Sequence, residues 1–376
     1  MKHLVKKIKS HHIVYLLAGG GILLAALSLN NQPLFSNLDQ FVLVAEDKIL
    51  LENNIQVSSG DLASNKEIRI RQNNIINGNL FADNIKIGAT STINGNASFN
   101  ELEINPLSQI LGQTSTLISS PIIKLPETPA FQAGEQDLTI TQDQIINPGN
   151  FDEIQVQPNI TLTLNPGIYN LNKLELENNS KLLFSASTTI NIQKELVIKE
   201  KILISQTTNP SASSGQVIPS TDLQINVIED KDIQIGKDSL LSIKLLAPNS
   251  QIILKERITF RGQILAREIK VGEGSVLSRN DDFEKESDLT KIIEEQEAKI
   301  IVNEIIIFFK DGASVVNLLE IANSIGARPT GFLEKLFMGK LEVEAMTFNE
   351  LENIINQIKN LNNPFIEEVL PNALIF

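Results

Sequence analysis

The strongest constraint on the fold is a repeat of 17 residues in the first third of the chain. Ile76-Asn77-Gly78-Asn79 recurs as Ile93-Asn94-Gly95-Asn96, and Ile110-Leu111-Gly112 forms a partial third copy at the same interval. The triplets Ile85-Lys86-Ile87 and Leu102-Glu103-Ile104 share this interval. Because alternate side chains of a strand point to opposite faces, each triplet directs two side chains inward and one outward. The repeat therefore predicts stacked coils of short strands.

Similar triplets continue through residues 41–279 without a helical stripe between them, which favours a parallel β-helix (solenoid) in a mainly β protein. A β-sandwich is the alternative. Prolines predict an interruption of the solenoid around residues 106–136, and the polar run at residues 205–221 predicts a loop. We expect the inward triplet positions to be buried and the outward ones exposed. The inward set is Ile85, Ile87, Leu102, Ile104, Ile269 and Val271, and the outward set is Lys86, Glu103 and Lys270.

Two segments carry a family resemblance. Residues 76–87, INGNLFADNIKI, resemble a rung of the bactofilins, a family of polymer-forming β-helical proteins. Residues 260–271, FRGQILAREIKV, are similar in the same register. The likeness covers residues 68–112 and 250–278, and it implies self-association of the solenoid. Bactofilins are largely cytosolic or associated with the cytosolic side of the membrane, whereas the N-terminus of this chain indicates export.

The pattern changes after a charged linker at residues 280–299. Residues 302–309 predict a strand, and Val315, Leu318, Ala322 and Ile325 form one helical face that ends at Gly326. Two strands follow, around residues 328–332 and 336–343. Thr347 and Glu350 form a capping box for a second helix, whose apolar face is Leu351, Ile354, Ile355, Ile358 and Leu361. With a last strand at residues 365–370, the order is βαββαβ, a small α+β ferredoxin-like arrangement over residues 301–376.

This domain also carries a resemblance, on the segments at residues 303–306, 309–312, 325–327 and 369–372. They are similar to the pro-domain of subtilisin-like proteases, especially the fervidolysin type. The resemblance implies that the domain inhibits or chaperones such a protease, with the segment after the last strand in the active-site cleft. Here that tail is Asn372, Ala373, Leu374, Ile375 and Phe376. No protease domain follows, so the partner would be a separate subtilisin-like protease. The alternative is an ordinary ferredoxin-like domain without a protease partner.

The N-terminus predicts export. Four lysines between residues 2 and 9 precede an apolar run from Ile13 to Leu29. A basic segment before an apolar one is typical of a signal peptide or signal anchor, and we assign residues 1–30 to it. The run is long for a cleaved signal, which favours an anchor in the cytoplasmic membrane. A buried core helix is the alternative. The remainder of the chain would then lie outside the cytoplasm, membrane-anchored or secreted.

The composition narrows the chemistry. The chain has no cysteine, and its three histidines all precede the apolar run, so the exported part lacks Ser-His-Asp triads and His- or Cys-ligated metals. The net charge of −13 disfavours nucleic acid as a partner. Asp281-Asp282 is an adjacent acidic pair without a spaced ligand set, which favours a solvated linker over a calcium site. We therefore expect no cofactor, no metal and no catalytic residue. The sequence thus favours a non-enzymatic exported surface protein, in which the solenoid is a rigid stalk or scaffold that presents the C-terminal domain as an interaction module. The alternative is an inhibitor or folding chaperone of a separate subtilisin-like protease, and an enzyme built on paired carboxylates is a third hypothesis.

Overall fold

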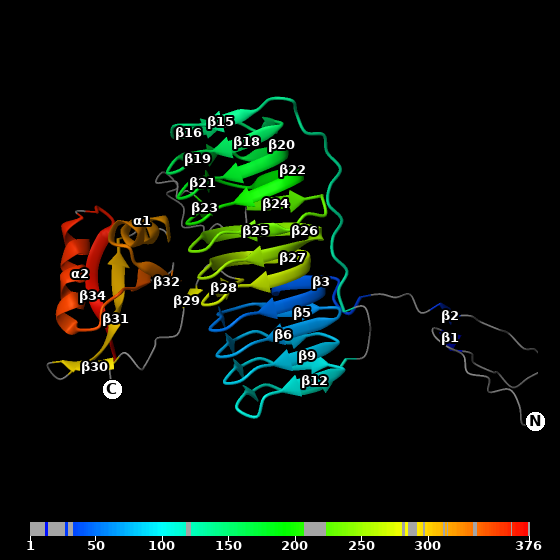
Figure 1. Cartoon of the computed structure of the whole chain (residues 1–376), viewed down its shortest axis with the longest axis horizontal. Coiled ribbons are helices and arrows are strands. Elements are labelled where there is room, and N and C mark those ends of the chain that lie inside the picture. Colours follow the sequence, from blue (N-terminus) through cyan, green and yellow to red (C-terminus); the bar gives the residue numbers. More distant parts are fainter. Residues whose placement is uncertain are drawn as a thin grey trace, which may run out of the picture.

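A parallel β-solenoid makes up most of the molecule, and a smaller domain with two helices lies against its side (Figure 1). The computed structural model describes residues 12–13, 27–28, 33–117, 122–206, 223–279, 283–284, 292–295, 298–310, 313, 315–333, 337–361 and 363–374. Near the N-terminus, β1 (His12–Ile13) pairs antiparallel with β2 (Leu27–Ser28). Residues 14–26 of the predicted signal segment lie outside the described residues.

The solenoid consists of two pieces that are separated in the chain. The lower piece in Figure 1 is formed by β3 (Phe41–Leu51), β4 (Gln56–Val57), β5 (Asp61–Ser64), β6 (Glu67–Ile70), β7 (Ile75–Ile76), β8 (Leu80–Phe81), β9 (Asn84–Ile87), β10 (Thr92–Ile93), β11 (Ala97–Phe99), β12 (Glu101–Ile104), β13 (Gln109–Ile110) and β14 (Thr114–Thr116). The upper piece is formed by β15 (Leu138–Ile140), β16 (Gln144–Ile146), β17 (Gly149–Asn150), β18 (Glu153–Val156), β19 (Thr161–Leu164), β20 (Gly167–Leu176), β21 (Lys181–Phe184), β22 (Thr188–Ile198), β23 (Leu203–Gln206), β24 (Leu223–Val227), β25 (Ile233–Ile235), β26 (Leu240–Leu254), β27 (Thr259–Val271) and β28 (Val276–Ser278).

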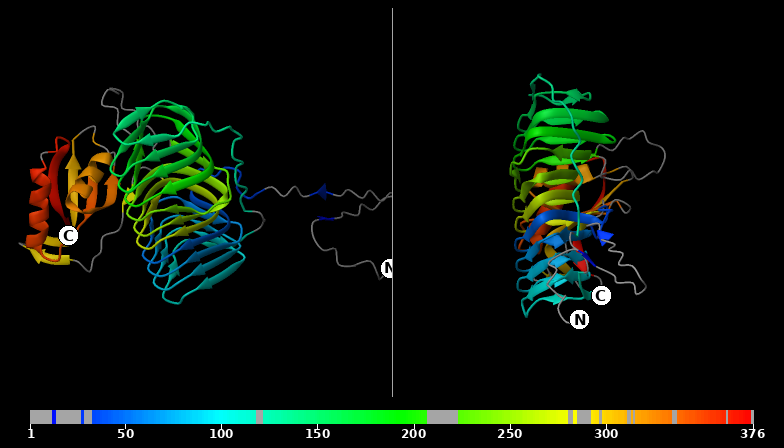
Figure 2. Two further views of the ribbon diagram at one scale, coloured as in Figure 1. Left: turned by 45° about the horizontal axis from the view of Figure 1, so that its top comes forward. Right: turned by 90° about the vertical axis from the view of Figure 1, so that its right-hand side faces the viewer.

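The coils stack on one another along the solenoid (Figure 2). Their strands pair in parallel, in the register that the 17-residue repeat predicts. Ile76 pairs with Ile93 and Ile93 with Ile110, while Ile85 pairs with Leu102. Each coil thus satisfies its backbone groups through the coils above and below it, as in other solenoids. A β-sandwich is built from antiparallel strands, so the parallel pairing removes that alternative.

The burial expected for the triplets is confirmed in the inner coils. Ile85, Ile87, Ile269 and Val271 are all buried, with at most 3% of each side chain exposed. The expectation is wrong at the last coil, where Leu102 is only half-buried and Ile104 is 38% exposed. Both lie on β12, which pairs on one side with β9 and has no described strand on the other. The terminal coil therefore leaves its inward side chains partly open to solvent. Of the outward positions, Glu103 is exposed, while Lys86 and Lys270 are half-buried.

The two pieces join in the reverse of their chain order. β27, near the end of the upper piece, pairs in parallel with β3, the first strand of the lower piece, from Ile264 opposite Leu43 to Val271 opposite Leu51. The first coil in the chain therefore lies in the middle of the solenoid. The sequence predicts an interruption but gives no sign of this order, because each coil presents the same apolar columns to its neighbours.

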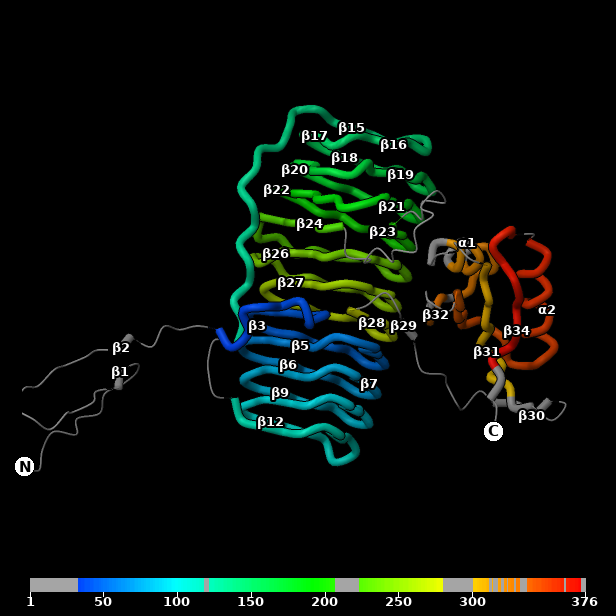
Figure 3. Tube along the Cα trace, turned by 180° about the vertical axis from the view of Figure 1, so that it is seen from behind, coloured from blue at the N-terminus to red at the C-terminus, as the bar shows by residue number. Residues whose placement is uncertain are grey.

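A strap connects the bottom of the solenoid to its top. Residues 122–137 of this strap run from the junction of the two pieces along the side of the upper piece to its far end (Figure 3). Ile122 and Ile123 are buried against an outward apolar patch that comes from both pieces. The Asn65 side chain accepts hydrogen bonds from the amides of Ile122 (2.8 Å) and Ile123 (2.9 Å) and donates one to the Ile123 carbonyl (3.0 Å). The patch consists of Val44, Ala63, Leu246 and Leu265.

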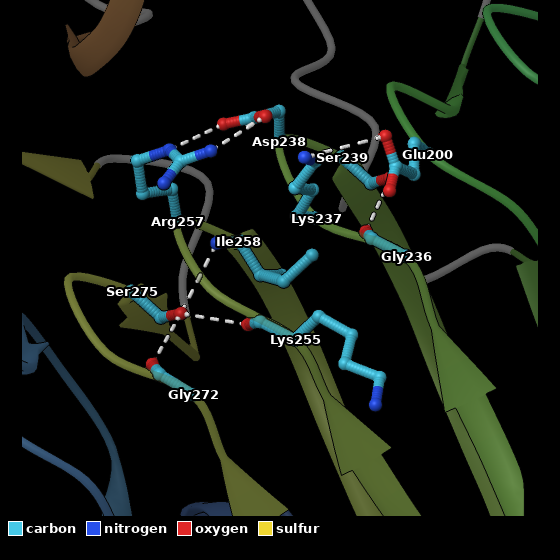
Figure 4. Close-up of polar contacts among 10 residues, drawn as sticks. All are labelled: Glu200, Gly236, Lys237, Asp238, Ser239, Lys255, Arg257, Ile258, Gly272 and Ser275. Atoms are coloured by element: carbon cyan, nitrogen blue, oxygen red, sulfur yellow. Dashed lines mark hydrogen bonds and ion pairs between the residues drawn. The ribbon is translucent and has the colours of Figure 1, made fainter.

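Glycine is required where the coils approach most closely. A Cβ built on Gly95 would overlap the carbonyl of Gly78, and one on Gly112 would overlap the carbonyl of Gly95. The Asn-Gly motif of the repeat therefore stacks as a column. Another corner turns through residues with positive φ, among them Asp238 and Arg257. There the Arg257 guanidinium forms two hydrogen bonds with the Asp238 carboxylate, at 2.6 and 2.8 Å (Figure 4).

The smaller domain has the element order that the sequence predicts. It contains β31 (Ala298–Phe309), α1 (Val315–Ile325), β32 (Arg328–Leu333), β33 (Met338–Glu342), α2 (Phe348–Asn360) and β34 (Ile366–Leu374), with β29 (Phe283–Glu284) and β30 (Ile292–Glu295) added at the sheet edges. The antiparallel sheet runs β32-β33-β31-β34. Thr347 and Glu350 form both hydrogen bonds of the capping box, and Gly326 has a φ of +67°. On the predicted helix faces, Leu318 and Leu351 are buried, whereas Leu361 is 41% exposed.

Candidate functional site

The candidate protease-binding tail begins inside a strand. Asn372, Ala373 and Leu374 are the last residues of β34, and they pair with Ile301, Ile300 and Lys299 of β31. Ile375 and Phe376 lie outside the described residues. The pairing makes the start of the tail a part of the sheet.

A buried polar group holds the start of this tail. The Glu304 carboxylate lies 3.9 Å from the Lys340 ammonium, and both side chains are at most 5% exposed. Asn372 donates a hydrogen bond of 2.7 Å to the same carboxylate oxygen of Glu304. A buried ion pair depends on such additional hydrogen bonds, because they offset the loss of hydration of its charges. The three side chains thus link the chain's end to the centre of the sheet.

One edge of β34 is available for pairing within the described part of the chain. Its described strand partner is β31, on one side only. An unpaired strand edge presents a row of backbone donors and acceptors to which an extended segment of another protein can add. Leu370 on this strand is 38% exposed. The tail region can therefore contribute main-chain hydrogen bonds and an apolar side chain to a partner.

The domain is docked on the solenoid through a column of outward leucine and valine side chains. Leu203, Leu240 and Val276 lie in one outward column of the solenoid, with Thr259 of an intervening coil between Leu240 and Val276, and each of the three is at most 5% exposed. They belong to the same buried cluster as Ile300 and Val302 of β31. Apolar side chains on an outer face are costly unless another element covers them. We call these three residues the docking column.

The sequence contains a signal for the docking column that the triplet pattern does not capture. Each member directly precedes an inward apolar residue, as in Leu203-Ile204, Leu240-Leu241 and Val276-Leu277. Two adjacent apolar residues in one strand predict burial on both faces. The same doubling at Leu245-Leu246 and Ile264-Leu265 marks the patch under the strap. The alternating positions of the triplets alone predict neither the docking column nor the patch under the strap.

The charged side chains of the solenoid form ladders between coils. Glu67 binds Lys48 of the coil above at 2.8 Å and Lys86 of the coil below at 3.2 Å. Burial acts to raise the pKa of Glu67, but the hydrogen bonds from these two lysines outweigh it and lower the pKa. In the upper piece, hydrogen bonds to Glu153 and Glu175 raise the pKa of Lys173. Such paired charges neutralise one another and stabilise the stack rather than supply a reactive acid or base.

Within the described ranges there is no group of three or more His, Cys, Asp and Glu side chains that could hold a metal ion. Asp281-Asp282, considered above as a calcium candidate, lies outside those ranges. None of the helices in the described part of the chain has the length and apolarity needed to cross a membrane.

No family model matches the chain, and no curated protein does. Three solved structures show a distant likeness, and all three are described as ice-binding proteins. That of the Antarctic ascomycete Antarctomyces psychrotrophicus has 14% identity and a TM-score of 0.28 over 65% of this chain and 96% of its own. One from an Antarctic biological consortium has 12% identity, a TM-score of 0.22 and coverage of 66% and 91%. One from an Antarctic bacterium of the Flavobacteriaceae has 13% identity and a TM-score of 0.24, over 63% of this chain and 79% of its own. TM-scores this low support no assignment, so the architecture rests on the strand pairing itself.

Proposed function

We propose that this chain is an exported, non-enzymatic surface protein in which a rigid β-solenoid is the scaffold for a C-terminal interaction module. The observation that carries the proposal is the docking column, since Leu203, Leu240 and Val276 fix the module to the side of the solenoid. A catalytic protein needs a converging set of reactive groups, whereas Glu67, Glu153 and Glu175 on the solenoid face are held in ion pairs with lysines. Binding is therefore the better-supported role.

We propose further that the module is a ferredoxin-like domain of the subtilisin pro-domain type. In support, its helices and strands follow the order βαββαβ, with the first and last of these strands adjacent in the sheet. Both helices pack on one buried cluster that includes Leu318, Leu351 and Ile307. A compact α+β module of this kind offers one helical layer and one exposed strand edge for recognition.

Export through the N-terminal segment is part of the proposal, with the cytoplasmic membrane as the partner of residues 1–30. Its support is the basic start followed by the apolar run at residues 13–29. A reporter that is active only in the cytoplasm, fused after Phe376, should be inactive in the host cell. The matched control lacks residues 1–30 and should be active. Strong reporter activity with the complete chain would contradict export.

A second function, inhibition or chaperoning of a separate subtilisin-like protease, is favoured by the position of β34. Asn372, Ala373 and Leu374 of the candidate tail belong to this strand, which has one edge without a described strand partner. The complete chain at micromolar concentration should slow such a protease. Removal of Ala373–Phe376 should abolish the effect. The shortened chain should stay folded, as circular dichroism can show, although it loses the strand pairs of Ala373 and Leu374 with β31. The inhibitor hypothesis fails if the complete chain does not inhibit, or if the protease digests it like an ordinary substrate.

Self-association of the solenoid is a further proposal, and the lower end supports it. The strands of the last coil, β12 to β14, pair with coils on one side only. Ile104, Leu107 and Leu111 at this end are 38%, 74% and 62% exposed. Sedimentation of the complete chain should show a species larger than the monomer, which Leu107→Lys with Leu111→Lys should dissociate. A monomer at every concentration would contradict the proposal.

A further inference from the structure

A polar groove lies at one corner of the lower piece, where a charged face of the solenoid turns into the next coil. It has a volume of about 530 Å³ and is lined by residues of four coils. Arg71, Gly88 and Asn105 occupy equivalent places on three of these coils. Gly88 has no side chain, and a Cβ there would lie 2.7 Å from the carbonyl oxygen of Arg71. This position opens the floor of the groove between the side chains around it.

Three cations surround this floor. Arg69 and Lys86 are direct register partners on β6 and β9, and Arg71 follows Arg69 at the next outward position. Arg71 is paired with Glu52 at 2.8 Å, and Lys86 is paired with Glu67 at 3.2 Å. Each of these acids also binds a second cation, which is Lys270 for Glu52 and Lys48 for Glu67. Glu268 opposite Lys48 and Glu103 opposite Lys86 bring the acids of this group to four, against these four cations. Arg69 is therefore the positive charge that is left over in the group.

Arg69 is the exposed cation of this group that has no ion pair or hydrogen bond to a side chain within the described residues. Directly paired positions on neighbouring strands lie about 4.8 Å apart, and like charges there repel one another. Other register columns alternate in sign, as in Glu268-Lys48-Glu67 and Glu153-Lys173-Glu195. The Arg69–Lys86 pair breaks this alternation, and an anion between the two side chains would restore it.

The remaining lining restricts the ligand to one charged end. Glu103 is the register partner of Lys86 on the lower side, so a second anionic group there would be repelled. Further along the same coil, the groove is lined by Ile104, the Asn105 amide and Pro106, which are all neutral. An arginine matches an oxyanion with two parallel N–H groups, whereas the neutral part suits a polar, uncharged body.

We propose that this groove binds a sugar unit bearing a single oxyanion group, a phosphate ester or a carboxylate. The oxyanion lies between Arg69, Arg71 and Lys86, above Gly88. The uncharged part of the sugar extends along Asn105 towards Ile104 and Pro106. The site needs neither the C-terminal module nor its tail, so it is independent of the function proposed above.

The test is a titration of the complete chain with glucose 6-phosphate and with glucuronate, which separate the phosphate from the carboxylate, and with neutral glucose. At least one of the two acids should bind saturably at low ionic strength, with an affinity that falls as salt is added, and glucose should not bind. Arg69→Gln should weaken the binding by about tenfold or more, as expected when a charge-assisted hydrogen bond is lost. Lys86→Gln should weaken it as well. Lys231→Gln is the matched control, since Lys231 is 56% exposed on the upper piece, and it should bind like the unaltered chain.

The same titration can overturn the proposal. It fails if neither acid binds saturably, if glucose binds as well as the acids, or if Arg69→Gln leaves the affinity unchanged. Thermal unfolding provides a second readout, because a ligand that binds only the folded state raises the melting temperature. Whichever of glucose 6-phosphate and glucuronate binds should raise the melting temperature of the unaltered chain and of Lys231→Gln. It should leave the melting temperature of Arg69→Gln unchanged. Because Arg69 is exposed and faces a like charge, Arg69→Gln should fold at least as stably as the unaltered chain.

Discussion

Replacement of Leu240 by aspartate should separate the C-terminal module from the solenoid without unfolding either part. Leu240 is 3% exposed and contributes to a column of three apolar side chains. Burial of each such side chain is worth about 1.5–3 kcal/mol, so the column contributes roughly 5–9 kcal/mol before the cost of ordering the interface. The substitution removes about one third of this gain. It also puts a carboxylate where no water remains, at a further cost of several kcal/mol. Together these losses exceed what the two remaining side chains supply.

Small-angle X-ray scattering and limited proteolysis of the linker at residues 280–299 can follow the separation. We expect Leu240→Asp to increase the radius of gyration and the rate of linker cleavage, with a circular dichroism spectrum like that of the unaltered chain. Thr92→Asp is the matched control, because Thr92 occupies the same outward column on a lower coil and is half-buried there. Equal radii and equal cleavage rates for Leu240→Asp and the unaltered chain would refute the docking argument.

Three further predictions concern the solenoid, each measured by thermal or denaturant unfolding. Gly95→Ala should destabilise the lower piece by about 1–3 kcal/mol, since the added Cβ would overlap a backbone carbonyl of the coil above. Its control is Gly149→Ala, whose Cβ meets only Phe151 at an ordinary distance and which should be neutral or slightly stabilising. Equal effects of the two substitutions on stability would contradict this explanation. Ile87→Asp should unfold at least its own coil, because it forfeits about 1.5–3 kcal/mol of burial and buries a charge, whereas Ile104→Asp at a 38% exposed position should be mild. Because the pKa of Glu67 is lowered in the folded state, the stabilisation by its carboxylate is complete above about pH 4.5 and is lost as the pH falls through the folded-state pKa. The difference in stability between the unaltered chain and Glu67→Gln should therefore shrink in acid. A difference that grows in acid would contradict this prediction.

The sequence was sufficient to predict what depends on local repetition. The 17-residue interval fixes which residues stack, and Ile76, Ile93 and Ile110 do pair in register. The capping box at Thr347 and Glu350 is equally local, because both hydrogen bonds form within one helical turn. Such features need no information about distant parts of the chain.

What the sequence could not supply depends on contacts between distant segments. The pairing of β27 with β3 joins residues more than two hundred positions apart, and identical apolar columns make many other orders equally plausible from the pattern alone. The burial of Leu240 likewise depends on a domain that begins some sixty residues later. The Arg69–Lys86 pair shows the same limit, since only the register places Leu50 and Lys86 opposite Arg69.

The reversed order of the two pieces bears on how the solenoid acts as a scaffold. The backbone amide of Arg279, where the chain leaves the solenoid, donates to the Ser59 carbonyl at 3.1 Å, and its guanidinium donates to the Asp39 carbonyl at 2.7 Å. The chain therefore leaves the solenoid beside the place where it enters, at the middle of the stack. A solenoid that served as a spacer would use its length, with its entrance and exit at opposite ends. Here the length extends above and below the point of attachment, and the module is held at the side. The two ends and the charged face, including the groove at Arg69, are thus the surfaces that the scaffold adds to those of the C-terminal module.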